Sequence, residues 1–132
     1  MQFFCPACFA ELPVSDPEQP CPRCGTVASA WEAGHSYTER LIHALGHPNS
    51  EARMGAILTL GNQGEVRAAL PLARCALAHP IDVVQSLEII RSLSKLPHGP
   101  ERAAALGLLL EHPARAVRRA ARRETAVVGT TD

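Results

Sequence analysis

Four of the five cysteines form two Cys-x-x-Cys pairs near the start of the chain. The first pair is Cys5 and Cys8, the second is Cys21 and Cys24, and twelve residues separate the two pairs. A two-residue spacer lets both thiolates of a pair turn toward one ion, so the two pairs supply the four sulfur ligands that Zn²⁺ favours. Because four protein ligands fill a tetrahedral coordination sphere, the spacing predicts a structural zinc ion and not a catalytic one.

Three other uses of these cysteines stay open on the sequence. Two disulfides would need an oxidising compartment, and the first residues carry neither the basic nor the apolar segment of an export signal. A redox-active pair would need a thioredoxin-like βαβ context, which the sequence does not indicate. Iron accepts the same thiolates, although the loop between the pairs is short for a rubredoxin-like fold. Zinc is therefore the predicted ion, with iron less favoured.

The segment Cys21-Pro22-Arg23-Cys24-Gly25 resembles the CPxCG knuckle of the zinc-ribbon family, whereas the first pair has Phe9 where that family often has glycine. The resemblance implies a small metal-nucleated module, because about 30 residues bury too little surface to fold alone. We assign residues 1–35 to this module. Its expected small core consists of Phe4, Phe9, Leu12, Val14, Val27 and Trp31. Trp31 either packs the module onto the rest of the chain or serves as an exposed anchor for a partner.

Composition divides the chain at about residue 35. All five aromatic residues lie in the first 37 positions, and residues 1–35 hold one arginine against four acidic residues. Residues 113–132 instead hold five arginines against two acidic residues, and the whole chain has a net charge of zero. The neutral total argues against a general polyanion binder. No apolar run reaches the roughly 18 residues of a membrane-spanning helix, and we expect a cytoplasmic protein.

A His-Pro dipeptide recurs in the second part of the chain, at His47-Pro48, His79-Pro80 and His112-Pro113. The spacings of 32 and 33 residues are typical of stacked helical hairpins. We expect hairpins at about 37–62, 65–96 and 100–127 within a repeat region 36–127, followed by a disordered tail at 128–132. Each proline is expected in the first turn of a second helix, and each histidine near the negative end of the preceding helix.

The segment from Leu45 to Arg53, followed by Ala56 to Gly61, resembles the short HEAT-like repeats of the phycobilisome-lyase type. The resemblance implies a right-handed α-solenoid in which the second helices line a concave, protein-binding surface. The expected fold is therefore mostly α, a short α-solenoid of three HEAT-like helical hairpins preceded by a small zinc-ribbon module with four cysteine ligands. Three units are near the minimum for a stable stack.

Five arginines mark the last predicted helix, with spacings that place them on one face. They are Arg115, Arg118, Arg119, Arg122 and Arg123. This face is either the polar cap of the final repeat or an anion-binding surface, for an acidic protein or a nucleic-acid backbone. We expect a polar cap, with partner binding as the alternative.

No motif for catalysis stands out. His43 and His47 lie four residues apart, but His47 belongs to the repeated dipeptide, and Cys75 has the apolar neighbours of a buried free thiol. We therefore expect a non-catalytic zinc-binding adaptor that binds other proteins, whose identity the sequence does not indicate. One alternative is a nucleic-acid-associated zinc-ribbon protein that uses the arginine stripe. Another is a lyase or enzyme accessory, which only the repeat resemblance implies.

Overall fold

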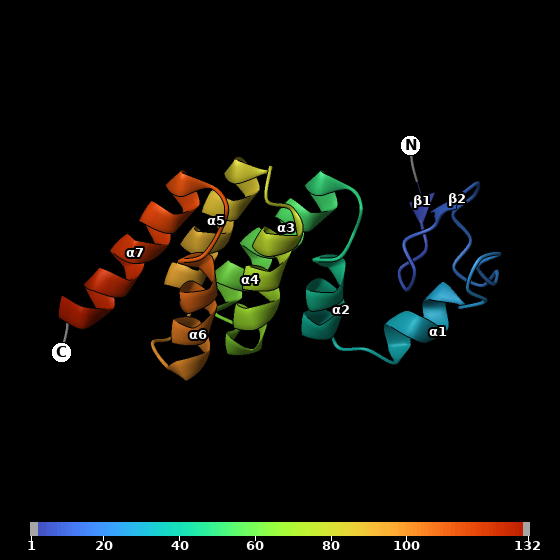
Figure 1. The fold of residues 1–132 in the computed structure, drawn as a ribbon. Coiled ribbons are helices and arrows are strands. Elements are labelled where there is room, and N and C mark those ends of the chain that lie inside the picture. Colours follow the sequence, from blue (N-terminus) through green and yellow to red (C-terminus); the bar gives the residue numbers. More distant parts are fainter. Residues whose placement is uncertain (1–2, 131–132) are drawn as a thin grey trace.

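The computed structural model describes residues 3–130, and their side chains as far as Ala126; it is mostly helical, as predicted (Figure 1). A small head, residues 3–35, contains two short strands and one short helix: β1 (Phe3–Phe4), β2 (Glu11–Leu12) and α1 (Ala28–Ala33). The helices of the remaining part, here the helical array, are α2 (Tyr37–Ala44), α3 (Ser50–Gln63), α4 (Ala69–Ala78), α5 (Val83–Ser94), α6 (Pro100–Leu109) and α7 (Arg115–Thr130). A 3-10 turn, η1 (Val66–Ala68), leads into α4.

Consecutive helices of the array pack in pairs: α2 on α3, α4 on α5, and α6 on α7. Helix α3 also packs on α5, which packs on α7, while α4 packs on α6. The helices therefore form two layers, with the head beyond α2 at one end and α7 at the other (Figure 1). Their shared core is built from aliphatic side chains and runs from Leu45 to Ala121 without a residue of the head. The head and the array consequently have separate interiors.

The turn within each pair differs from the sequence-based expectation. Helix α3 begins at Ser50, after the N-cap Asn49, whose side chain accepts hydrogen bonds from the amides of Glu51 and Ala52. Pro48 thus lies in the turn and not in the first turn of the helix, because Asn49 provides the stronger cap. The predicted starts at the other two prolines were likewise early, since α5 begins at Val83 and α7 at Arg115.

The histidines of the first and third turns bond to the backbone that follows them. Nδ1 of His47 accepts the amide of Asn49 at 3.0 Å, and Nδ1 of His112 accepts the amide of Ala114 at 2.9 Å. An accepting Nδ1 carries no proton, so these rings, which lie after the end of the preceding helix as expected, act as hydrogen-bond acceptors for the turn. In this fold the two rings stabilise their turns as hydrogen-bond acceptors.

An arginine six residues after each of these histidines closes the same turn. Nη1 of Arg53 donates to the carbonyls of His47 and Pro48 at 2.9 and 3.0 Å. Nη1 of Arg118 donates to the equivalent carbonyls of His112 and Pro113, both at 2.8 Å. The first and third turns therefore repeat at the level of individual hydrogen bonds.

The middle turn has a glutamine in place of that arginine. Gln85 is 1% exposed, and its Oε1 accepts a hydrogen bond from Nε of Arg53 at 2.7 Å. This bond joins α3 to α5 through the buried interior. Where the other two turns have an arginine that bonds within its own helical pair, the middle turn has a glutamine that bonds to the neighbouring pair.

Gly61 is an inner residue of α3, although the sequence places it in a segment rich in helix breakers. A Cβ atom at Gly61 would lie 2.6 Å from Oγ of Ser92 and 2.8 Å from its Cα, so α3 and α5 approach too closely for any larger residue. The hydroxyl of Ser92 donates to the Ile57 carbonyl at 2.8 Å across the same contact. The helix ends only at Gly64, whose φ of 65° suits glycine.

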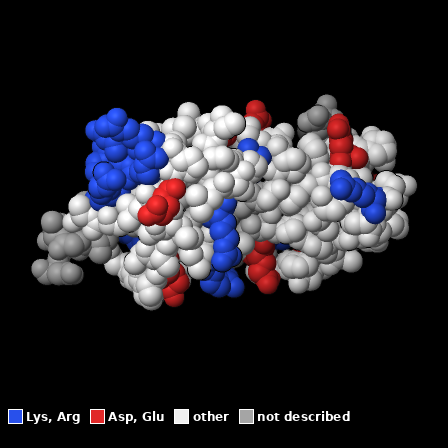
Figure 2. Space-filling model, in the orientation of Figure 1, with Lys and Arg blue, Asp and Glu red and all other residues white. Residues whose placement is uncertain are grey.

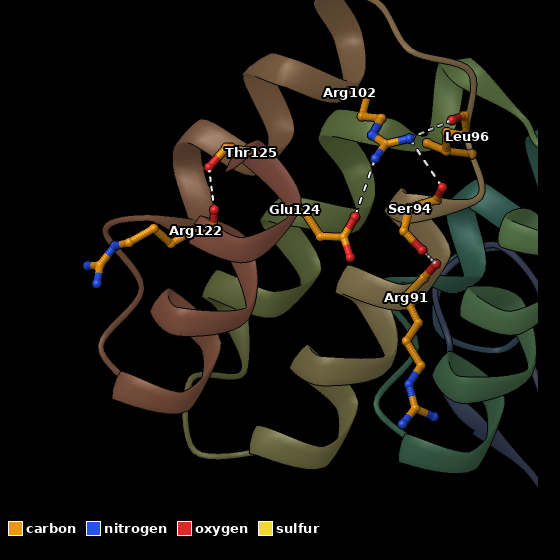
Figure 3. A network of polar contacts seen from close by, with 7 residues as sticks. All are labelled: Arg91, Ser94, Leu96, Arg102, Arg122, Glu124 and Thr125. Carbon is orange, nitrogen blue, oxygen red and sulfur yellow. Dashed lines mark hydrogen bonds and ion pairs between the residues drawn. The ribbon is translucent and has the colours of Figure 1, made fainter. Parts of the chain in front are cut away.

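A buried arginine fastens the last pair to the end of α5. Nη1 of Arg102 donates to the carbonyls of Ser94 and Leu96, both at 3.1 Å, and Nη2 pairs with Oε2 of Glu124 at 3.3 Å (Figure 3). Arg102 is 4% exposed, so its charge is neutralised inside the fold. Breaking such a pair would leave one charge buried, which is strongly destabilising.

Helix α7 extends to Thr130, into the segment 128–132 for which a disordered tail was expected, while 131–132 lie outside the described residues. Each residue added to an existing helix gains one backbone hydrogen bond, which favours continuation once the helix is nucleated. Among the described residues, no helix has the length and apolar character needed to cross a membrane.

Candidate metal centre

The sulfur atoms of four cysteines converge at the centre of the head. The Sγ atoms of Cys5, Cys8, Cys21 and Cys24 all lie within 4.8 Å of one another. Sγ of Cys5 lies 3.6 Å from Sγ of Cys24, and Sγ of Cys8 lies 3.7 Å from Sγ of Cys21. All four predicted ligands are thus brought together. Each of these two close sulfur pairs joins one cysteine of the first Cys-x-x-Cys segment to one of the second.

These separations fit one metal ion. A tetrahedral ion with metal–sulfur bonds of about 2.3 Å has sulfur–sulfur edges of roughly 3.8 Å, close to the two measured distances. A disulfide would need about 2.05 Å, and all five cysteines of the chain are free. The four thiols can therefore hold a metal ion, and the disulfide alternative does not apply to this fold.

The two Cys-x-x-Cys segments have the same backbone hydrogen bonds. The amide of Phe9 donates to the Cys5 carbonyl at 2.9 Å, and the amide of Gly25 donates to the Cys21 carbonyl at 2.8 Å. The amides of Cys5 and Cys21 in turn donate to carbonyls five residues ahead, both at 2.9 Å. The chain thus forms two equivalent turns, which present their thiols toward a common point.

Phe9 adopts the left-handed conformation that glycine adopts in the second turn. Its φ is 64°, against 77° for Gly25, and it is the one non-glycine residue with positive φ in the described chain. This conformation costs a side-chain-bearing residue about 1 kcal/mol or more. The strain persists because the turn requires it and because the ring packs against a neighbouring helix.

Hydrogen bonds at the centre shift the acidity of the thiols. The side chain and the amide of Thr26 lower the pKa of Cys24 to about 6, and the backbone of Cys24 lowers the pKa of Cys21. The backbone of Ala10 also lowers the pKa of Cys8, but desolvation and the other three thiols outweigh it and raise this pKa to about 11. Thiolate formation, which metal binding requires, is thus favoured at Cys24 and Cys21 and opposed at Cys8.

The head rests against α2 through aromatic and imidazole rings. Nε2 of His43 donates to the Ala7 carbonyl, inside the first knuckle, at 2.7 Å. The centroid of the Phe9 ring lies 4.8 Å from those of both His43 and His47. The two histidines are therefore engaged in packing and hydrogen bonding, and the described residues place no metal-ligand group around them.

Trp31 belongs to the same contact. Its ring stacks on His35 with centroids 4.4 Å apart and lies 5.1 Å from the His43 ring, and its side chain is half-buried. Trp31 therefore packs the head onto α2, which was one of its two expected roles. Val14, expected in the core of the head, is 55% exposed because it lies in the loop between the knuckles.

No family model matches the chain, and neither a curated protein nor a solved structure matches it. The sites described here therefore rest on the geometry of this chain alone.

The predicted arginine stripe lies at the opposite end of the molecule from the metal centre. Arg115, Arg119, Arg122 and Arg123 are exposed, and Figure 2 shows a compact block of basic side chains over the end formed by α7. Arg118 was expected on the same exposed face, but its guanidinium turns back and donates to the carbonyls of the preceding turn. Four of the five arginines thus remain directed at solvent.

Sequence reasoning missed three contributors to these sites. Thr26 tunes a knuckle thiol, His43 holds the head on α2, and Arg53 closes a turn. The repeated columns contained a signal for the last of these, since arginine stands six residues after the histidine in two of three units. The other two have no sequence signature, because they depend on contacts between segments that the chain brings together only on folding.

Proposed function

We propose that the protein is a non-catalytic, zinc-structured adaptor. In this proposal the four cysteines hold one zinc ion, and the three helical pairs form a short HEAT-like solenoid that binds other proteins. The close convergence of the four sulfurs is the observation that carries the proposal. Four thiolates complete the coordination of zinc and leave no position for a substrate, so the ion would serve as the folding nucleus of the head.

The choice of zinc rests on the donor set. Four thiolates at tetrahedral spacing suit zinc, and zinc-binding peptides of this size gain on the order of 10–16 kcal/mol from the ion. The head needs such a source of stability because, of its described side chains, only Cys5 and Cys21 are buried. Iron would accept the same ligands and is therefore an outcome that the test must distinguish.

The adaptor role is supported by what the buried polar side chains do. In the helical array they are Arg53, Gln85, Ser86, Ser92, Arg102 and His112. Each bonds to another part of the fold, as when Nε2 of His112 donates to the Ala76 carbonyl at 3.1 Å. Stacked helical pairs held by such bonds present a rigid surface, which is the usual basis of protein binding by repeat proteins.

Apolar side chains at the middle turn favour a protein partner. Ile81 is 94% exposed and Val84 is 71% exposed, at and beside the start of α5. Ile81 also lines a shallow depression together with Arg53, His79 and Asp82. Exposed apolar side chains bordered by polar groups are typical of protein–protein interfaces, whose apolar centre has a polar rim.

The metal assignment is tested by native mass spectrometry of the whole chain. We expect one zinc per chain, and none in the variant Cys21→Ser, which removes one ligand of the site. Cys75→Ser is the matched control, because Cys75 lies in α4 and donates its thiol hydrogen to the Leu45 carbonyl. Purification with iron, or as a folded chain without any metal, would contradict the assignment.

The adaptor role is tested by affinity capture with purified chain from its native cell extract. We expect a protein that is retained in stoichiometric amount by the wild type and lost with Ile81→Glu/Val84→Glu. Val14→Glu is the control, since Val14 is an exposed apolar residue of the head. Retention of nucleic acid in place of protein, or no retained protein above a blank matrix, would reject the adaptor.

A further inference from the structure

The outward face of α7 carries charge that the fold does not use. We call Arg115, Arg119, Arg122 and Arg123 the arginine face. Within the described part of the chain, none of these four guanidinium groups makes a hydrogen bond or an ion pair. The one acidic residue of the described α7 side chains, Glu124, is already paired with Arg102. In Figure 3 the Arg122 side chain extends away from that pair.

Several other arginines of the array are paired with acidic side chains. Arg67 pairs with Glu65 at 3.2 Å, and Arg91 pairs with Glu88 at 2.8 Å. The acidic side chains visible in Figure 2 lie outside the block of basic side chains. The arginine face is therefore a local excess of positive charge on a chain whose net charge is zero.

The face has a defined shape. From Arg115 to Arg123 the helix advances eight residues, or about 12 Å. Its opposite side, with Val117, Ala120 and Ala121, is buried against the array, so the guanidinium groups point away from the molecule. Arginines three and four residues apart repel one another along this face. A helix face that served only as a solvated end cap could avoid this repulsion by placing acidic residues among the arginines. A bound anion would relieve the repulsion on a face that has none available.

Several features favour protein carboxylates over nucleic acid as that anion. All five aromatic residues lie within the first 37 positions, so the arginine face has no ring on which a base could stack. The patch is also short, and affinity for a phosphate backbone grows with the number of phosphates that are neutralised. A nucleic acid extending along the molecule would reach a head that holds one arginine against four acidic residues.

We propose that the arginine face binds a short acidic segment of a partner protein. Each guanidinium fork can bind a carboxylate in a bidentate pair, and the face offers such forks on successive helical turns. Glutamates spaced three and four residues apart on a partner helix match this repeat. The inference rests on the proposed adaptor function and supplies the chemistry of one partner surface.

The test uses a fluorescein-labelled, glutamate-rich peptide of about 16 residues, with its glutamates spaced three and four apart. Its binding to the zinc-loaded full chain is measured by fluorescence anisotropy at low and physiological salt. We expect Arg119→Glu/Arg122→Glu to weaken binding by at least about ten-fold. Arg74→Glu/Arg91→Glu changes the net charge equally on exposed residues elsewhere, and it should stay within about two-fold of the wild type. Circular dichroism verifies that both variants are folded.

Other results overturn the proposal. Equal binding of a peptide with glutamine in place of glutamate would show that charge recognition is absent. Tighter binding of a single-stranded or duplex oligonucleotide, lost in Arg119→Glu/Arg122→Glu, would assign the face to nucleic acid. Dimers of the free chain that this variant abolishes would assign it to a second copy. If the wild-type chain captures a protein partner but does not bind the peptide, and the variant captures that partner equally well, the adaptor stands and the arginine face does not. A wild-type chain that neither binds the peptide nor captures a protein rejects both.

Discussion

The ring of Phe9 lies 4.8 Å from the ring of His43, so the residue that replaces a knuckle glycine also holds the head against α2. The backbone strain at Phe9, whose φ is 64°, is thereby coupled to a contact between the two parts of the molecule. The turn that follows Cys5 and Cys8 and the packing on the array meet at this one residue. The knuckle that presents Cys8 is also the surface that contacts α2.

We predict that Phe9→Gly retains the metal but loosens the head. Glycine relieves about 1 kcal/mol of left-handed strain, while the contacts with His43 and His47 are lost. Trp31, the single tryptophan, reports the change, because it packs on His43 in the same contact. Quenching of its fluorescence by acrylamide should rise, with metal content unchanged. Phe9→Tyr keeps the ring and should behave as wild type; unchanged quenching in Phe9→Gly would refute the coupling.

Two glycines of α3 should respond to alanine in opposite directions. A Cβ at Gly61 would lie 2.6 Å from Oγ of Ser92, so Gly61→Ala should lower the free energy of unfolding by about 1–3 kcal/mol. A Cβ at Gly55 meets nothing within 4 Å, so Gly55→Ala should raise it by about 0.5–1 kcal/mol through helix propensity. Urea unfolding followed by circular dichroism measures both. Two shifts of the same sign would argue against the close packing of α3 on α5.

The arginines that close the turns should differ in their contribution to stability. Arg53 is 6% exposed and donates to three acceptors, so Arg53→Ala should cost about 2–4 kcal/mol. Arg118 is less buried and donates to two carbonyls, so Arg118→Ala should cost about 1–2 kcal/mol. Arg74→Ala, at an exposed position, should change stability by less than about 0.5 kcal/mol. Thermal and urea unfolding rank the stability of the three variants. An equal loss of stability in all three would show that the hydrogen bonds to the turn carbonyls do not stabilise the fold.

Acidification should destabilise the array through His79. Burial lowers the pKa of His79, and the positive charge of Arg53 lowers it further. The unfolded chain takes up this proton near pH 6.5, while the folded chain does so only at lower pH. The unfolded state therefore binds more protons in this window, and the contribution to stability is complete above about pH 6.5 and lost as the pH falls through the folded pKa.

The measurement compares urea midpoints at about pH 7.5 and pH 5.5 for wild type and His79→Gln. The variant should lose less stability on acidification, since its side chain does not titrate. His98→Gln, at an exposed position, is the control and should keep the wild-type dependence. Release of metal from the thiolates affects all three chains alike. An unaltered pH dependence in His79→Gln would contradict the assignment.

The sequence predicted what depends on local spacing. The four cysteines and the recurring His-Pro dipeptides carry short-range geometry, and they led to a cluster of sulfurs that can hold a metal ion and to a mostly helical second part. The six-residue helix α1 had no such signal, because it is too short for an apolar period to develop. The position of Trp31 against His43 depends on how the head meets α2, which spacing alone does not determine.

The errors have a common physical origin in contacts that the local pattern does not contain. Pro48 was expected in the first turn of a helix, but Asn49 caps a helix that begins after it. The sequence likewise does not show that Gly61 lies against Ser92 of another helix. Arg118 has the spacing of the exposed arginine stripe, yet its guanidinium donates to two carbonyls of the preceding turn and so does not face solvent with the others. In each case a contact with another segment, or a cap at a neighbouring residue, determines the structure in place of the local sequence pattern.

Because position 85 is a glutamine, the middle turn is held by different hydrogen bonds from the other two turns. The carbonyls of His47 and His112 are each held by an arginine six residues onward, whereas the carbonyl of His79 is held by the amide of Asp82. Arg53, which joins α3 to Gln85 of α5, bridges the seam between the first two pairs. The middle hairpin therefore lacks the arginine bonds that close the other two turns, and we expect its turn to open more readily than theirs.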